Sequence, residues 1–421
     1  MTITRTLAAT LLAALTAGTA TAAAAPAPRP VPGAKAPAGR SATATGFRTV
    51  RTTSFTAQSV TSPATGTAVV VGVKARPGAP GPIVVETVGP LGWTTRTLPG
   101  SATQARVASG AGTAWVLGIG ATPTLWRSQG TRHERVAVPL PPGTTAFTPY
   151  AVAAEGHTVV LWGATTGAGS RPGSGALARF DGRTWTFQQD SFGPTTLYGP
   201  SDRTGDAVLE LVGGHALAGT GFMGATHIYG TLYDYATTPP KDLGWLEVHA
   251  PDGGGYRAQA LTARSPQDVT AWGAGTTLDP RGDLVYRTRG LCLRVTPGRR
   301  DRCPAPAYAV TAADHLADGR QVVGGQDTFT TDDRITQERT DLVQGGYAVL
   351  TAQGATPQVL PGDPGDAVVD LAAEPRGSVV WSVVRTGSRT AVQRAVLTVG
   401  TTARTAPRPL AVPPARGPVR G

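Results

Sequence analysis

The stretch from His215 to Tyr235 holds the densest set of side chains that could bind a ligand. It reads HALAGTGFMGATHIYGTLYDY and contains His215, Phe222, His227, Tyr229 and Tyr233. Aromatic rings stack on sugar faces and histidines form hydrogen bonds with hydroxyl groups, so one interpretation is a carbohydrate platform. A metal site completed by Asp234 is a second interpretation, although the two histidines lack metal-ligand spacing. The structural alternative is that these tyrosines pack in a core.

A second group of polar side chains is rich in carboxylates and lies between Gln326 and Gly345. It contains Asp327, Asp332 and Asp333, which we include among the candidate ligand-binding residues. Clustered hard oxygens favour calcium, but the alternating carboxylate spacing of a dedicated calcium loop is missing. The alternative is a solvated loop whose charges are offset by Arg334 and Arg339.

Catalytic signatures are mostly absent. The chain has no G-x-S-x-G, no H-E-x-x-H and no C-x-x-C. The segment GTGFMG matches G-x-G-x-x-G, but no helix follows it, so we treat the match as chance. Two carboxylates at a working separation for glycoside hydrolysis stay possible, because spacing along a chain does not give distance in space. We therefore predict no catalytic residue, no metal and no cofactor.

The two cysteines, Cys292 and Cys303, flank a turn in LCLRVTPGRRDRC. Two strands that leave one tight turn bring such positions opposite each other, at a separation that a disulfide can bridge. A redox-active pair is the alternative, but the C-x-x-C spacing is missing. We predict a structural disulfide.

These residues must be positioned by a repeated β unit, for which residues 151–189 serve as the template. The template has four strand-like runs, and Asp181-Gly182 is a hairpin signal before the last of them. An apolar run closed by a small residue recurs along the chain, at Gly72, Gly118, Gly163, Gly213, Gly273, Gly324 and Ser382. Seven units follow, so we predict an all-β, seven-bladed β-propeller of four-stranded antiparallel blades. The last unit lacks an outer strand, and we expect residues 46–55 to supply it and close the ring.

Several segments resemble repeats of known propellers. SPQDVTAWG (265–273) and ARFDGRTW (178–185) resemble the repeats of secreted bacterial β-propellers. Val212-Gly213-Gly214 and Val323-Gly324-Gly325, each followed by later Tyr or Trp residues, resemble kelch repeats, in which a double glycine ends the second strand. The resemblance implies a fold, because such propellers serve lectins, enzymes and adhesion proteins alike.

The connections between second and third strands should all emerge on one side of a propeller. Units two and seven have short ones (120–123 and 385–389), whereas units three to six have long ones (164–175, 215–228, 274–286 and 326–345). Long loops in a compact repeat often carry function. We therefore predict a non-catalytic binding module that recognises a glycan, a cell-wall polymer or a protein on this side. The alternative is an extracellular carbohydrate-active hydrolase or lyase that uses carboxylates there.

The two ends of the chain predict where the protein acts. Residues 1–25 have the layout of a secretory signal peptide, with cleavage expected near Ala22 to Ala25. Residues 26–45 and 402–421 are rich in Ala, Pro and basic residues, and we expect a disordered leader and tail around a propeller at 46–401. The net charge of +11 comes mainly from these tails, which argues against a nucleic-acid partner. We expect a secreted monomer with no membrane span.

Overall fold

The computed structural model describes most of one compact unit, Arg40–Gly421. The leader up to residue 41 and the tail from residue 400 lie outside the described residues. The described ranges are 42–75, 79–167, 174–190, 207–223, 228–245, 256–278, 285–296, 299–306, 308–332, 339–350, 358–364 and 366–399.

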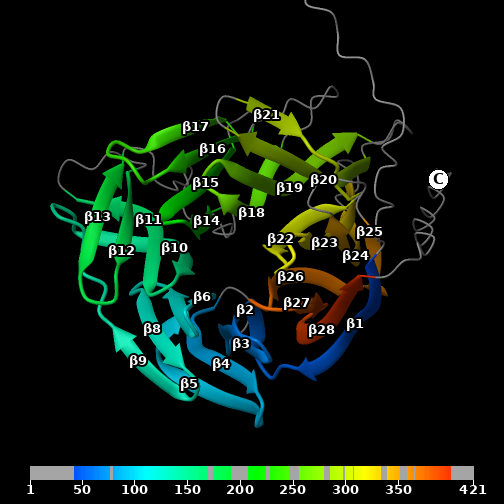
Figure 1. The fold of residues 1–421 in the computed structure, drawn as a ribbon, viewed down its shortest axis with the longest axis horizontal. Coiled ribbons are helices and arrows are strands. Elements are labelled where there is room, and N and C mark those ends of the chain that lie inside the picture. Colours follow the sequence, from blue (N-terminus) through cyan, green and yellow to red (C-terminus); the bar gives the residue numbers. More distant parts are fainter. Residues whose placement is uncertain are drawn as a thin grey trace, which may run out of the picture. The chain divides into compact units, whose positions relative to one another are not determined.

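The strands form seven four-stranded antiparallel blades around a central axis (Figure 1). The first strand of each blade lies innermost, and these are β2 (Thr56–Ala64), β6 (Gln104–Gly110), β10 (Ala146–Glu155), β14 (Ala207–Val212), β18 (Tyr256–Ser265), β22 (Ala309–His315) and β26 (Asp366–Ala373). The second strands are β3 (Thr67–Val73), β7 (Thr113–Ile119), β11 (Thr158–Thr166), β15 (His215–Met223), β19 (Asp268–Leu278), β23 (Gln321–Asp332) and β27 (Val379–Thr386). The third strands are β4 (Gly81–Gly89), β8 (Thr124–Gln129), β12 (Gly175–Phe180), β16 (Ile228–Asp234), β20 (Val285–Thr296), β24 (Arg339–Leu350) and β28 (Arg389–Val399). The outer strands are β5 (Gly92–Ala102), β9 (Arg132–Val136), β13 (Trp185–Asp190), β17 (Lys241–Trp245), β21 (Arg299–Arg302), β25 (Gln358–Pro364) and β1 (Ala42–Thr52).

Strand β1 closes the ring, which confirms the predicted role of the N-terminal segment. It pairs antiparallel with β28, from Ala42 opposite Val399 to Thr52 opposite Ala391. It begins before the expected start at Gly46. Side chains of β1 also reach both neighbouring blades: Phe47 stacks on Tyr347 of blade six, and Arg51 forms an ion pair with the buried Glu86 of blade one.

The hydrophobic core is divided into seven clusters, one between each pair of adjacent blades. Three tryptophans of second strands, Trp115, Trp162 and Trp272, are fully buried there. Burial of large aromatic side chains is among the strongest contributions to folding free energy. A cluster between blades seven and one shows that the closing interface is packed like the others.

The recurring glycine of the second strands has a geometric cause. Gly72, Gly163 and Gly273 lie opposite β-bulges in the first strands of their blades, and in blade six the glycine at this place is Gly325, one position after the expected Gly324. A Cβ atom at Gly72 would lie 2.0 Å from the carbonyl oxygen of Thr56, and one at Gly163 would lie 2.2 Å from that of Thr148. The bulged strand approaches too closely for any side chain.

Unit four is shifted by one strand from the sequence-based prediction. The run ending at Gly213 is the first strand, β14, and not the second. Gly213 and Gly214 form the turn that follows it and have φ values of 56° and 78°, which glycine adopts readily. Gly324 and Gly325 instead lie inside a second strand, β23. The two double glycines therefore occupy different places, and the kelch-like alignment fails in unit four.

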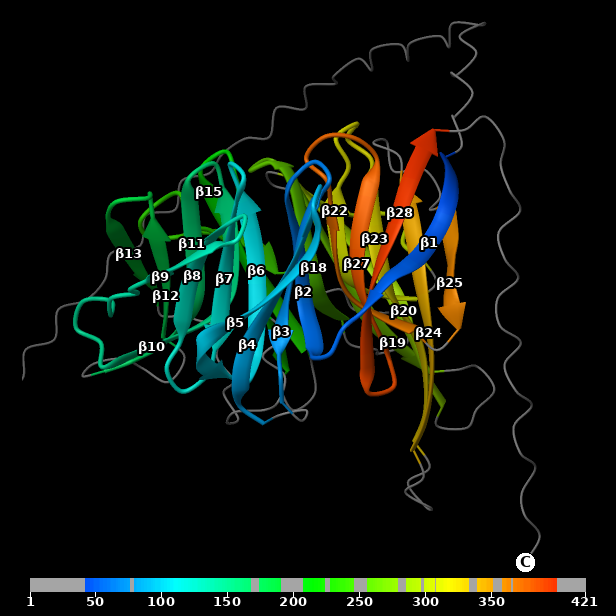
Figure 2. The same ribbon diagram turned by 90° about the horizontal axis from the view of Figure 1, so that it is seen from below.

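Blades five and six are joined into one eight-stranded sheet. Their second and third strands extend beyond the blades as long hairpins, and β20 pairs with β23 from Val285 opposite Thr331 to Arg287 opposite Phe329. The predicted long loops of these units are thus largely strand, as Figure 2 shows for β23, β24, β19 and β20. These segments contain several threonines together with Val, Tyr and Phe, residue types that favour a β-strand.

The predicted disulfide is confirmed. Cys292 of β20 is bonded to Cys303, which directly follows β21, and their Cα atoms are 5.1 Å apart. The peptide N–H of Cys303 also donates to the carbonyl oxygen of Cys292. Across the described ranges, no helix has the length and apolar character needed to cross a membrane.

Candidate functional site

His215 does not lie on the side that carries the connections between second and third strands, which we call the loop side. It begins β15 immediately after the Gly213-Gly214 turn, so it lies on the opposite side, the turn side. There its Nδ1 atom is 2.8 Å from Oδ2 of Asp234 at the end of β16. The prediction placed His215 in a loop because the strand shift in unit four was not recognised.

The predicted aromatic platform is split in the same way. Tyr233 lies near the turn-side end of β16, half-buried against Tyr235 and the cluster between blades three and four. Phe222 and Tyr229 are paired across β15 and β16 at the loop-side end. His227 lies between these strands, outside the described residues. The positions of Phe222 and Tyr229 are therefore at the opposite end of the β15–β16 hairpin from those of His215 and Tyr233.

The acidic candidates belong to the extended hairpin of blade six. Asp327 and Asp332 lie on β23, where their backbone partners are Gln344 and Arg339 of β24. Asp333 follows β23 and lies outside the described residues. Ligand binding at these three residues stays a prediction.

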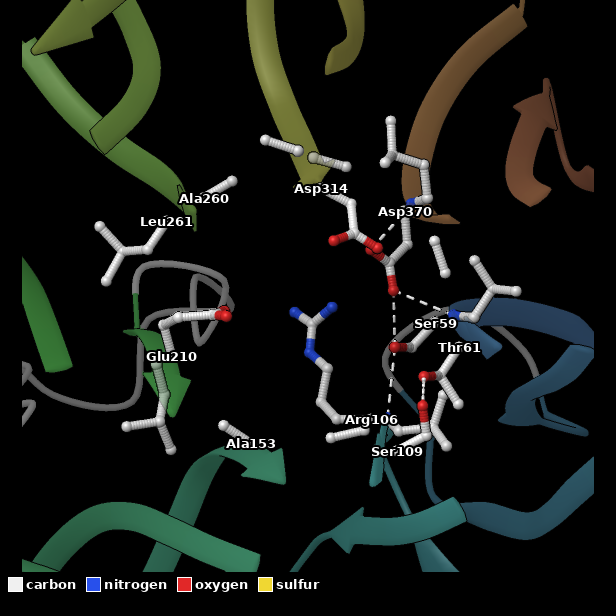
Figure 3. Close-up of a pocket in the computed structure, with 18 of the residues that line it drawn as sticks. Ser59, Thr61, Arg106, Ser109, Ala153, Glu210, Ala260, Leu261, Asp314 and Asp370 are labelled. Carbon is white, nitrogen blue, oxygen red and sulfur yellow. Dashed lines mark hydrogen bonds between the residues drawn. The ribbon is translucent and has the colours of Figure 1, made fainter. Parts of the chain in front are cut away.

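The structure brings a different set of residues together in the central channel. A cavity of about 590 Å³ runs along the axis, and all seven innermost strands line it. Arg106, Glu210, Asp314, Asp370 and Glu374 are its charged lining residues, together with His315. Figure 3 shows Arg106 of blade two and Glu210 of blade four directed into the cavity, with Asp314 close to Asp370.

Asp370 connects blade seven to blade one. Its Oδ2 atom accepts hydrogen bonds from the hydroxyl of Ser59 at 2.6 Å and from the N–H of Val60 at 3.0 Å. The N–H of Leu371 donates to Oδ1. Burial raises the pKa of Asp370, while these hydrogen bonds and the charge of Arg106 oppose the rise. This carboxylate is held in a structural role at the ring closure.

Asp314 has the same role between blades six and seven. Its Oδ2 atom accepts from the N–H of Ala373 at 2.8 Å, and its Oδ1 atom accepts from the N–H of His315 at 2.6 Å. Burial raises its pKa to about 6, with a further contribution from the charge of Asp370. Each carboxylate thus satisfies backbone donors of the next blade.

Glu210 differs from these two carboxylates because its side chain forms no hydrogen bond with the described residues. Its side chain is reachable from the channel but is surrounded by protein, so water solvates it poorly. Burial, together with the charges of Asp314 and Glu155, raises its pKa from 4.5 to about 8. At neutral pH the group is therefore mostly a neutral carboxylic acid.

Arg106 is the only Lys or Arg among the described lining residues of the cavity. It donates from Nη1 to the carbonyl oxygen of Gln58 at 3.5 Å. Burial lowers the pKa of its guanidinium, and the charge of Asp370 opposes this shift. The guanidinium of Arg106 therefore interacts with the charge of Asp370 more than with that of Glu210.

Two further groups face the same cavity. Burial lowers the pKa of His315 to about 4, with a contribution from Arg264, so the imidazole is neutral at pH 7. The Oε1 atom of Gln259 is buried and accepts no hydrogen bond from the described residues. Within the described ranges, no three His, Cys, Asp or Glu side chains are grouped closely enough to hold a metal ion.

The sequence contained a signal for this site that the loop-centred analysis missed. The short apolar run that comes before each second strand is an innermost strand, and four of these runs carry a charged residue that lines the cavity. These runs are ARVAS, AVLELV, AVTAAD and AVVDL, with Arg106, Glu210, Asp314 and Asp370. A charge inside such a strand has only the channel to face, because both flanks pack on neighbouring blades.

No protein-family model matches this sequence, and no curated protein matches it. Among solved structures, the β-propeller domain of Cps50 (Swd1) from Myceliophteria thermophila is 12% identical, with a TM-score of 0.45 over 82% of this chain and 99% of that chain. The WD40 β-propeller domain of Doa1 is 9% identical, with a TM-score of 0.48 over 83% and 97%. YCF48 from Cyanidioschyzon merolae is 12% identical, with a TM-score of 0.46 over 83% and 98%. The blade count rests on the strand order of this chain.

Proposed function

We propose that this protein is an exported, non-catalytic binding module that holds a polar ligand in its central channel. The observation that carries the proposal is that the carboxyl groups of the channel differ in their hydrogen-bond partners. Asp314 and Asp370 satisfy backbone donors of adjacent blades, whereas Glu210 faces the cavity with no hydrogen bond to the described residues. A glycan, a cell-wall polymer or a protein could present the polar group that Glu210 would bind.

Export is part of the proposal. It is supported by the signal-peptide layout of residues 1–25 and by the disulfide, which persists in oxidising compartments. The extended hairpins of blades five and six support the binding part of the proposal, because they enlarge the side on which a macromolecular ligand would rest.

A thermal-shift screen tests the binding function. Mature protein would be incubated with saccharides, cell-wall fragments and small organic amines. A ligand at a hundred times its dissociation constant stabilises the fold by about 2.7 kcal/mol, which is a measurable shift in melting temperature. Glu210→Gln should reduce the shift, whereas Glu134→Gln on the exposed strand β9 should not. No shift with any ligand class, or equal shifts in both variants, would contradict the proposal.

A carbohydrate-active hydrolase or lyase is the second candidate. One observation favours it: Glu210 and Asp314 face one cavity and both have raised pKa values, as a general acid requires. Against it, Asp314 is committed to two backbone donors. Release of reducing ends or unsaturated products from a glycan panel, abolished by Asp314→Asn, would establish this candidate over the first.

A further inference from the structure

The charges that line the channel do not balance. Four carboxyl groups line the cavity, from Glu210, Asp314, Asp370 and Glu374, against the single guanidinium of Arg106. The charge of Asp370 interacts with that of Arg106, and Glu374 accepts a hydrogen bond from the indole N–H of Trp381 at 3.0 Å. Glu210 and Asp314 are therefore left without a cationic partner among the described lining residues.

The groups that face Glu210 make the same point. From blade three comes Glu155, whose two oxygens accept from the N–H groups of Gly213 and Gly214. From blade six comes Asp314, and both of these charges raise the pKa of Glu210. Gln259 of blade five lines the same cavity, and its acceptor Oε1 is buried without a donor among the described residues. Of these acceptors, the Glu210 carboxyl group and Oε1 of Gln259 have no hydrogen-bond donor among the described residues, and a positively charged N–H donor would satisfy them.

We propose that the channel binds the cationic end of a ligand, a guanidinium or primary ammonium group, between Glu210 and Asp314. This proposal rests on the binding function above and names the ligand class. The cation donates hydrogen bonds to both carboxylates, and Glu210 releases its proton to solvent when the cation arrives. The cavity volume of about 590 Å³ leaves room for a short alkyl chain beside that group.

The test compares two probes of the same shape. The n-butylguanidinium ion carries the charge, and n-butylurea is its neutral analogue. Isothermal titration calorimetry at pH 7, in two buffers of different ionisation enthalpy, measures both affinity and the protons released. We expect n-butylguanidinium to bind at least about tenfold more tightly than n-butylurea, since hydrogen bonds between charged groups exceed neutral ones by about that factor. Binding should release a proton.

Two variants make the test specific. Glu210→Gln should weaken n-butylguanidinium binding by about tenfold and abolish proton release, while circular dichroism shows an intact fold. Glu134→Gln, on the exposed strand β9, should change neither. Equal affinity for the two probes, or cation binding that ignores Glu210→Gln, would overturn this inference. If saccharides shift the melting temperature but n-butylguanidinium does not bind, the binding function stands and the cationic ligand class falls.

Discussion

At the scale of single residues, carboxylates in the channel divide between structure and binding. Asp314 and Asp370 each accept a hydrogen bond from a backbone N–H group of the next blade. Without the carboxylate, these N–H groups would lose that acceptor. The side chain of Glu210 accepts no hydrogen bond from the described residues. The difference between these acids lies in their partners and not in their type.

Replacing Asp370 with alanine should lower the free energy of unfolding by about 2–4 kcal/mol. The change leaves the Ser59 hydroxyl and the Val60 N–H without their acceptor and removes the countercharge of Arg106. Chemical denaturation measures the loss. Glu134→Ala on the exposed surface is the control and should stay within about 0.5 kcal/mol of the wild type. A loss no larger than the control would contradict the structural role.

Replacing Glu210 with glutamine should change how stability depends on pH. The pKa of Glu210 rises from 4.5 to about 8 in the folded state, so the folded protein holds this proton more tightly than the unfolded chain. The wild type therefore loses stability as pH rises from 4.5 to 8, and the variant lacks this loss. The free energy of unfolding would be measured at pH 6.5 and at pH 8. Both values lie above the pH range in which Asp314 titrates, because its pKa is about 6. The free energy of unfolding of the variant, relative to the wild type, should be higher at pH 8 than at pH 6.5. An equal difference at the two pH values would contradict the burial of Glu210.

Sequence reasoning missed these residues for a physical reason. It searched the loops, where length and polarity are visible, whereas the channel residues lie in short apolar strands. A charge such as Asp370 in AVVDL is compatible with either an exposed edge or an axial channel. The choice depends on ring closure, which brings residues from blades six, seven and one together across more than three hundred positions of the chain.

At the scale of elements, the order of strands could be predicted well. The hairpin signal Asp181-Gly182 marks the turn between β12 and β13, and the disulfide hairpin formed as expected. Unit four was out of phase because the Gly213-Gly214 turn resembles the glycine that faces a bulge in other second strands. Both places demand glycine, one for its positive φ and the other for close approach, so composition alone does not distinguish them.

The closing strand β1 should contribute strongly to stability. Phe47 is 8% exposed and packs in the cluster between blades six and seven, stacked on Tyr347. Phe47→Ala should therefore lower the free energy of unfolding by about 3 kcal/mol. Val50 lies on the same strand with 43% exposure, so Val50→Ala should cost less than about 0.5 kcal/mol. Similar losses in the two variants would show that β1 is not packed into the ring.

At the scale of the whole molecule, ring closure creates the channel. Each blade contributes one inner strand, and seven hydrophobic clusters hold the blades side by side. The axis is too wide for the side chains of these strands to fill, which leaves the cavity that Glu210 and Arg106 face. The proposed function depends on this cavity and on the excess of carboxylates around it.

A crystal structure of the protein soaked with n-butylguanidinium tests the central claim most directly. The account predicts density in the channel with the guanidinium group between the carboxylates of Glu210 and Asp314, and no such density in Glu210→Gln. Density for the probe on the outer surface with an empty channel would contradict it.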